Sequence, residues 1–286
     1  MSAPVPDPAT PAVTLNRMKL RTVPARQGAL WVRQGFQVFF KQPMAFAALF
    51  AAFMFAVFVF ALLPIVGTLL VLAALPLVSL GFMIASRQAM EGQFATPRVF
   101  IDPLRGPRPQ AIALAQLGLA YAAATFVIMF LSDRVDGGAF EALMDAMPNA
   151  QNAPQVVAGK LADPGLWFGM LLRLGLAGAL SVPFWHAPAL VHWDGHGCAK
   201  SLFSSTVACW RNRGAFAVYS LGWFALIMAV GAVGSMVFGL LGQAQLFALA
   251  AVPMSLLLTT VFYASLYFTF ADCFSADDAA VAAPSP

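Results

Sequence analysis

The residue types best suited to metal chemistry gather in one short stretch near the middle of the chain. It holds all three histidines of the sequence, with one aspartate and one cysteine: His186, His192, Asp194, His196 and Cys198. Imidazole, carboxylate and thiolate groups bind zinc or copper, and a glycine-containing loop could let them converge. Their spacing matches no zinc signature, and His and Trp also favour the water interface of a membrane. The stretch is therefore either a metal site built on His192, Asp194, His196 and Cys198 or a polar exit from a membrane.

A second set of polar side chains follows one face of the last apolar segment. These residues recur at every fourth position: Ser255, Thr259, Tyr263 and Tyr267. Because residues four apart share a helix face, they form a polar stripe, and Gln116 adds an amide in another apolar segment. Such groups hydrogen-bond between membrane helices or to the carbonyl that Pro253 frees. The alternative is one wall of a cavity for a polar or amphipathic ligand.

Signatures of enzymes are absent from the sequence. There is no HExxH, GxSxG or P-loop motif, and the glycines between 231 and 242 are typical of helix packing rather than of a phosphate site. No acidic residue falls in the predicted spans given below, which argues against a proton-driven pump. We expect no enzymatic activity and no cofactor. A metal-dependent enzyme acting on lipid headgroups stays as an alternative, and only the His192–Cys198 stretch could support it.

The composition requires a membrane setting for these residues. Hydrophobic residues make up 60% of the 286 positions and charged residues only 10%, against about 45–50% and about 25% in soluble domains. A run of about 20 apolar residues crosses the hydrocarbon core as a helix. The sequence predicts an all-α integral membrane protein with six transmembrane helices near 44–63, 68–86, 111–131, 165–191, 215–240 and 246–270. They form one domain over 24–274 with a polar outer loop at 132–164, and we expect 1–23 and 275–286 to be disordered.

Two basic amphipathic segments, at 26–41 and 198–213, precede the first and fifth spans. Each is either a cytoplasmic-side helix lying in the headgroup layer or a flank that only sets orientation. As helices they would offer five headgroup contacts: Arg33, Lys41, Lys200, Arg211 and Arg213. Basic residues fall on one side of a six-span arrangement and the acidic 132–164 loop on the other. The positive-inside rule therefore places both termini in the cytoplasm of a bacterial inner membrane. Arg173, inside the fourth span, either reaches the headgroups or is functional.

Two parts of the sequence are similar to each other, and each starts at one of the amphipathic segments. Residues 39–46 and 209–216 each lead from a basic helix into a span, a short turn and a second span, in which a proline follows: Pro76 in one copy and Pro253 in the other. Four spans separate the copies, so a duplication would insert them in parallel. The alternative is chance similarity between two hydrophobic hairpins.

Several motifs carry a resemblance to a known family: residues 25–32, 63–67 and 187–191, the set Ser205, Ala208, Cys209, Arg211 and Asn212, and residues 267–274. On these the chain resembles an uncharacterised proteobacterial family of six-span inner-membrane proteins. More distantly it is similar to the membrane portion of glycerophosphodiester phosphodiesterases. The resemblance implies location and fold but no reaction, because the phosphodiesterase catalytic domain is absent. His192 and His196 lie outside the shared pattern.

These observations favour a non-enzymatic inner-membrane protein that engages anionic lipid, a partner protein or a second copy of itself through its basic helices. A carrier or permease-like component is the alternative, with Gln116, Ser255, Thr259 and Tyr263 around a cavity and prolines as hinges. Nucleic acid is not an expected partner, because the positive charge is spread along the flanks of the spans.

Overall fold

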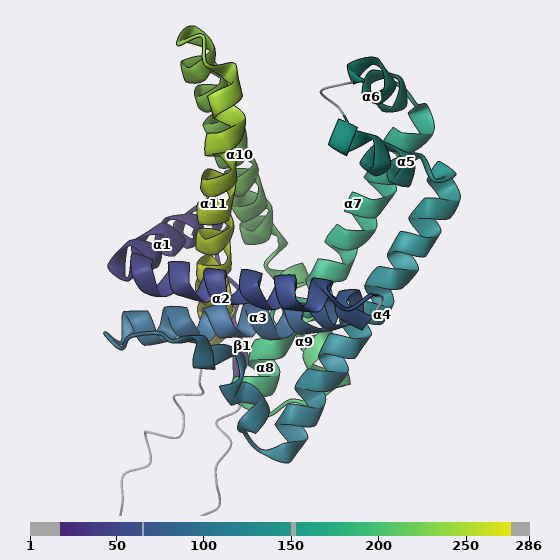
Figure 1. Cartoon of the computed structure of the whole chain (residues 1–286). Helices are drawn as coiled ribbons and strands as arrows, with labels where there is room; N and C mark the ends of the chain where they lie inside the picture. Colours follow the sequence, from purple (N-terminus) through teal and green to yellow (C-terminus); the bar gives the residue numbers. More distant parts are fainter. Residues whose placement is uncertain (1–17, 65, 150–152, 276–286) are drawn as a thin grey trace, which may run out of the picture.

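The computed structural model describes residues 18–64, 66–149 and 153–275 (Figure 1). The predicted all-α membrane fold is confirmed, because six helical segments of this part are long and apolar enough to cross a bilayer. They are α2 (Pro43–Ala61), α3 (Val66–Met90), α4 (Arg108–Asp136), α7 (Pro164–Phe184) continued by α8 (Ala187–Asp194), α10 (Arg213–Leu240) and α11 (Ala244–Cys273). Large apolar side chains cover much of their outer surface, as a bilayer requires.

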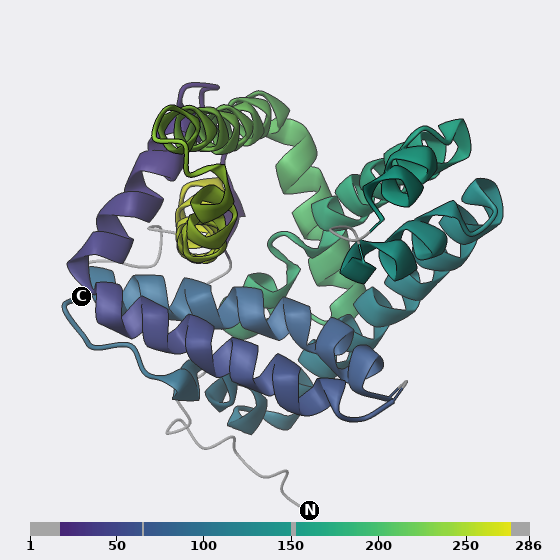
Figure 2. The ribbon, with the colours of Figure 1, turned by 45° about the horizontal axis from the view of Figure 1, so that its top comes forward.

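The long helices form two diverging arms joined by a crossing hairpin. One arm is α10 with α11 and the other is α4 with α7 (Figure 1). The α2–α3 hairpin crosses between them, and α3 packs against both α4 and α11 (Figures 1 and 2). Gly118 of α4 permits the closest approach, since a Cβ there would overlap the carbonyl of Ala73 in α3. The hairpin therefore fixes the distance between the arms.

Shorter helices occupy the segments between the spans. The two predicted amphipathic helices are present as α1 (Gln27–Lys41) and α9 (Cys198–Arg211). The loop predicted at 132–164 holds α5 (Ala139–Ala146), η3 (Met147–Asn149) and α6 (Pro154–Leu161), and α4 runs on to Asp136 before Gly137 and Gly138 turn the chain at positive φ. Two 3₁₀ turns, η1 (Pro97–Phe100) and η2 (Asp102–Arg105), precede α4. The order of elements repeats around α1–α3 and α9–α11, but duplication stays a prediction.

The predicted disordered segments reach too far into the chain. Strand β1 (Lys19–Leu20) pairs antiparallel with β2 (Phe274–Ser275). Beyond β1, the side-chain oxygen of Asn212 accepts from the N–H of Val23 at 2.8 Å, and its amide donates to the carbonyl of Arg21 at 3.0 Å. These bonds satisfy backbone groups that a disordered chain would leave to water. The remainder of the two predicted segments, 1–17 and 276–286, lies outside the described residues.

Helix α1 is docked into the α10–α11 arm rather than lying alone on a surface. Trp31 is fully buried against Phe216 and Tyr219 of α10. Two glycines let the helix backbones meet: a Cβ on Gly28 would overlap the backbone of α10, and a Cβ on Gly35 would lie 2.6 Å from the Cβ of Ser265 in α11. This close packing determines which face of α1 is covered by α10 and α11 and which face can line a cavity.

Candidate functional site

The α1 cavity is a space of about 540 Å³ beside α1. Its lining residues come from three helices: Gln34, Gln37, Phe40 and Lys41 of α1, Met90 of α3 and Phe268 of α11. Two amides and one ammonium group thus face an apolar wall. That combination suits a molecule with a polar head and an apolar body.

Hydrogen bonds near both ends of α1 hold this lining in place. Towards its N-terminus, the Trp31 indole and the Gln27 amide each donate to Oδ2 of Asp272, at 2.7 Å. After its last residue, the side-chain amide of Gln42 donates to the Gln93 carbonyl at 2.8 Å. The first pair ties α1 to α11, and the second ties it to the chain that follows α3. The α1 cavity is therefore preorganised by contacts outside it.

The polar groups of the α1 cavity are incompletely paired. The Lys41 ammonium donates to the thioether of Met90 at 3.5 Å, a weak acceptor. Within the described part of the chain no carboxylate forms an ion pair with it. The side-chain oxygen of Gln34 is buried, and no described group donates to it. A buried acceptor without a donor costs free energy, so a ligand that supplies an anion and a donor would be stabilised here.

The other predicted headgroup contacts lie outside the α1 cavity. All are exposed, on α1, on α9 or at the start of α10: Arg33, Lys200, Arg211 and Arg213. Arg211 donates to the hydroxyl of Thr22 at 3.3 Å, and the Arg213 guanidinium lies 5.8 Å from the ring centre of Trp210. They form a dispersed basic surface, and Lys41 alone of the five lines the α1 cavity.

The predicted polar stripe of α11 does not line one cavity. Tyr263 lines a space between the arms, whereas Ser255 lines an apolar space between α10 and α11. Thr259 and Gln116 are exposed, and Tyr267 packs edge-on against Trp193. The reason is that α11 changes neighbours along its length, meeting α10 in its first part and α1 and α3 further on.

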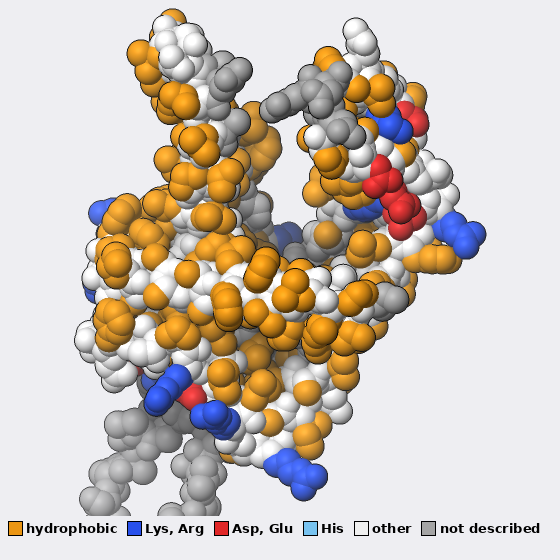
Figure 3. All heavy atoms as spheres, in the orientation of Figure 1, with side chains coloured by type: hydrophobic (Ala, Val, Ile, Leu, Met, Phe, Trp, Pro, Cys, Tyr) orange, Lys and Arg blue, Asp and Glu red, His pale blue; other side chains and the backbone are white. Residues whose placement is uncertain are grey.

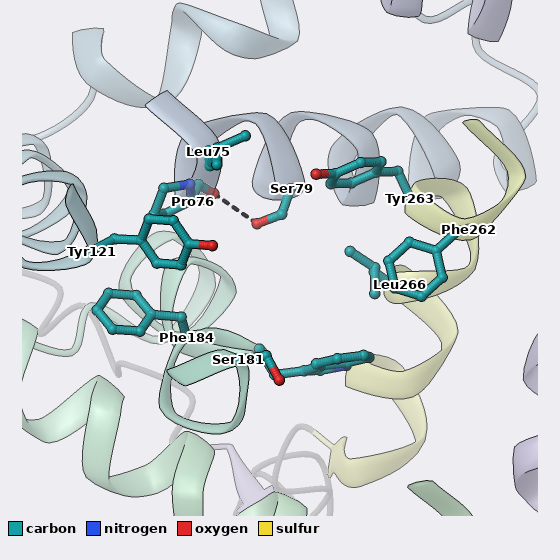
Figure 4. A pocket seen from close by; sticks show the side chains of 10 residues that line it. Leu75, Pro76, Ser79, Tyr121, Ser181, Phe184, Phe262, Tyr263 and Leu266 are labelled. Atoms are coloured by element: carbon teal, nitrogen blue, oxygen red, sulfur yellow. Dashed lines mark hydrogen bonds between the residues drawn. The ribbon is translucent and has the colours of Figure 1, made fainter. Parts of the chain in front are cut away.

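The space at Tyr263 is the central cavity, with a volume of about 210 Å³. It is lined by ten residues of α3, α4, α7, α11 and the α7–α8 junction: Leu75, Pro76, Ser79, Tyr121, Ser181, Phe184, Trp185, Phe262, Tyr263 and Leu266 (Figure 4). Sequence reasoning missed Ser79, Tyr121 and Ser181. A usable signal was the proximity of each serine to a proline inside the same predicted span, Pro76 or Pro183.

The histidine stretch does not assemble as a metal site. His186 is fully buried, its backbone N–H donates to the Ser205 hydroxyl at 3.0 Å, and its ring lies 3.2 Å from the Thr269 hydroxyl. His196 pairs with Asp194 at 2.8 Å. No three His, Cys, Asp or Glu side chains in the described ranges form a group that could hold a metal, and the candidates His192 and Cys198 thus join no such set.

Burial also shifts the pKa values of two side chains in this loop. Burial lowers the pKa of His196, with Asp194 opposing that effect and Lys200 adding to it. Burial likewise raises the pKa of the Cys198 thiol. Neutral imidazole and neutral thiol are therefore the forms that the loop favours.

Arg173 belongs to an ion-pair cluster between α4 and α7. Its guanidinium pairs with Asp133 and, at 2.8 Å, with the fully buried carboxylate of Asp136, and it lies 4.2 Å from the ring centre of Phe140 in α5. The expectation that the spans hold no acidic residue is wrong at this point, because α4 extends to Asp136. Asp133 is exposed and Asp136 is buried, so the cluster runs from the surface inwards and both carboxylates engage the Arg173 guanidinium.

Comparison with known proteins identifies the family. Over 262 residues the chain is 32% identical to a probable inner membrane protein of Burkholderia thailandensis, in an alignment that covers 91% of this chain and 96% of that relative. The chain belongs to this family of inner membrane proteins. The name of this relative states no activity, and the comparisons do not show the more distant likeness to phosphodiesterase membrane portions. No family profile and no solved structure matches the chain.

Proposed function

We propose that this protein binds an anionic phospholipid in the α1 cavity. The observation that carries the proposal is the exposed Lys41 ammonium, which lines the cavity and has only the Met90 thioether as a partner among the described residues. A phosphodiester is the anion that a membrane offers at this position, and each such contact near an anionic surface is worth about 1 kcal/mol. The apolar wall of Phe40, Met90 and Phe268 would lie along the acyl chains.

The buried side-chain oxygen of Gln34 indicates which kind of phospholipid headgroup fits the α1 cavity best. It is an acceptor without a described donor, so a headgroup that carries hydroxyl groups beside its phosphate fits better than one without donors. Phosphatidylglycerol has this combination. Gln37, on the same lining, can donate through its side-chain amide to a phosphate oxygen. The proposal assigns binding to these residues and no reaction.

Location and orientation belong to the same proposal. The family of inner membrane proteins and the six apolar helices support the bacterial inner membrane. In Figure 3, Lys and Arg side chains appear along the lower edge of the molecule and also on the α4–α7 arm, while acidic side chains appear mainly on that arm. By the positive-inside rule, the basic lower edge supports a cytoplasmic position for the β1–β2 end and, with it, for both termini.

Thermal unfolding with added lipid tests this function. The purified chain in a neutral detergent is titrated with dioleoyl-phosphatidylglycerol or with dioleoyl-phosphatidylcholine. We expect saturable stabilisation by the first lipid only, since a ligand that binds the folded state raises its stability in proportion to the logarithm of its concentration. The same titration is run on K41Q and on the matched control R33Q, which removes a charge from the same helix outside the cavity.

The two variants separate the α1 cavity from general surface charge. K41Q should lose the stabilisation by phosphatidylglycerol, and R33Q should keep it. Equal losses in both variants would show that diffuse charge binds the lipid and would overturn the assignment to the α1 cavity. A concentration-dependent oligomer with no lipid effect would instead favour a protein partner.

A further inference from the structure

Two serines in the lining of the central cavity already donate their hydroxyl protons to backbone carbonyls. The Ser79 hydroxyl donates to the Pro76 carbonyl at 2.8 Å, and the Ser181 hydroxyl donates to the Gly178 carbonyl at 2.7 Å. Each serine bonds within its own helix, α3 or α7. Their oxygens therefore retain lone pairs and can act as acceptors towards the cavity.

Two tyrosines supply the complementary donors. Figure 4 shows the hydroxyls of Tyr121 and Tyr263 pointing towards Ser79 from opposite sides of the space. Neither hydroxyl has a hydrogen-bond partner among the described residues, and both tyrosines line the same cavity as Ser79 and Ser181. Their rings are held by aromatic neighbours, Tyr121 by Phe184 at 5.1 Å and Tyr263 by Phe82 at 5.2 Å. The donors are thus fixed in place before a ligand arrives.

Prolines free backbone carbonyls in two of the helices that line the cavity. Pro76 lines it, and because proline has no N–H, the carbonyl of Leu72 loses its partner within α3. Pro183 deprives the carbonyl of Ala179 in the same way in α7. Unpaired backbone groups at membrane depth are tolerated where they line a cavity that can satisfy them. Two helices that face the same space therefore share this feature.

Among the described residues, no charged side chain lines the central cavity. An ionised group would be costly there, because nothing in the lining compensates its charge. Its lining includes residues of both arms, α4 and α7 on one side and α11 on the other, and Figure 3 shows a hollow between the two arms. A volume of about 210 Å³ corresponds to about seven waters at ~30 Å³ each. That is room for a small head, not for a whole lipid.

We propose that the central cavity binds the uncharged, oxygen-bearing head of a neutral amphipathic lipid, with Tyr121 and Tyr263 donating to its carbonyl or hydroxyl oxygens. The lipid's chains lie outside, between the arms. This site is separate from the α1 cavity and does not depend on the function proposed for it. It differs from the sequence-predicted cavity, with which it shares Tyr263.

Binding of dioleoylglycerol to the full chain tests the proposal. This probe has ester carbonyls, one hydroxyl and no charge. The chain is placed in phosphatidylcholine nanodiscs, and bound dioleoylglycerol is measured by native mass spectrometry over a concentration series. We expect saturable binding of one molecule, and about ten-fold weaker binding for the double variant Y121F/Y263F, because each lost hydrogen bond weakens binding by roughly two- to twelve-fold.

Two controls keep the outcome decisive. Y267F removes a tyrosine hydroxyl from the same helix outside the central cavity and should bind as the unmodified chain does. Dioleoyl-phosphatidic acid, which has the same two acyl chains but a charged phosphate in place of the hydroxyl, should not compete. Absence of saturable dioleoylglycerol binding, equal binding by Y121F/Y263F and Y267F, or full competition by phosphatidic acid would each overturn the proposal.

Discussion

The indole N–H of Trp31 donates to the carboxylate of Asp272 at 2.7 Å, across 241 positions of sequence. Gln27 donates to the same carboxylate oxygen. Trp31 has no exposed surface and Asp272 is partly buried, so the indole donor of this bond is shielded from water. The bond sets the position of α1 against the end of α11. Because α1 is a continuous helix, the bond also sets the position of Lys41 at the other end of α1.

Replacing Trp31 with Phe should lower the midpoint of thermal unfolding. The change removes the bond to Asp272 while keeping an aromatic ring, at a cost of about 1–2 kcal/mol. The matched control is Trp210→Phe on α9, whose side chain is 70% exposed, and it should leave the midpoint unchanged. Equal effects of the two substitutions would show that the Trp31 bond contributes nothing specific.

Gly28→Ala should destabilise the docking of α1. An added Cβ would overlap the backbone of Ala215 in α10, and overpacking of this kind costs about 1–3 kcal/mol. Gly159→Ala on α6 is the control, because nothing lies within 4 Å of its added Cβ and alanine is the better helix former. We expect thermal unfolding at a lower temperature for Gly28→Ala and no loss for Gly159→Ala. Unchanged unfolding of the first variant would mean that α1 can move away without cost.

Arg173→Gln should separate α4 from α7. The Arg173 side chain is only 17% exposed and Asp136 is fully buried, so removing the cation leaves an uncompensated carboxylate at a cost of about 3 kcal/mol. Arg134→Gln is the control, because Arg134 is exposed and contacts only the Phe130 ring in the described structure. Proteolysis within 137–163 reports the difference, and it should accelerate for Arg173→Gln alone. Equal cleavage of both variants would contradict a structural role for the ion pairs.

The thiols of α9 should react in a fixed order. Burial raises the pKa of Cys209 to about 12 from 9.0, while Cys198 is partly exposed. The thiolate is the reactive form of cysteine. At pH 8 the fraction of Cys209 present as thiolate is therefore about a thousandth of that of a thiol with the ordinary pKa. Iodoacetamide should therefore modify Cys198 well before Cys209, with the unfolded chain as the control in which both react. Mass spectrometry of the peptides reads the order, and faster labelling of Cys209 would show that α9 is not packed as described.

Local pattern predicted the spans better than their ends. The apolar runs found all six membrane-type helices, but α4 continues to Asp136 because Arg173 from a distant helix pairs with its last turns. Similarly, residues 18–23 look structureless alone and gain order from β2 and from Asn212. Partners remote in sequence decide both cases, and hydropathy contains no information about them.

The α1 cavity and the central cavity differ in the same way in how far local sequence pattern predicted them. Lys41 was predicted as a headgroup contact from its place on an amphipathic helix, and it does line the α1 cavity, although lipid binding there stays a proposal. The central cavity could not be assembled from one periodic stripe, because its polar lining comes from several helices and Tyr263 is the one member of the α11 stripe in its lining. Spacing within α11 places Ser255 and Tyr263 on one face but does not reveal that different neighbours cover them.

The most direct test of the lipid site is native mass spectrometry of the chain released from phosphatidylglycerol-containing membranes in mild detergent. The account predicts one retained phosphatidylglycerol per chain, kept in R33Q and lost in K41Q. Retention of the same lipid at the same occupancy by K41Q would contradict it.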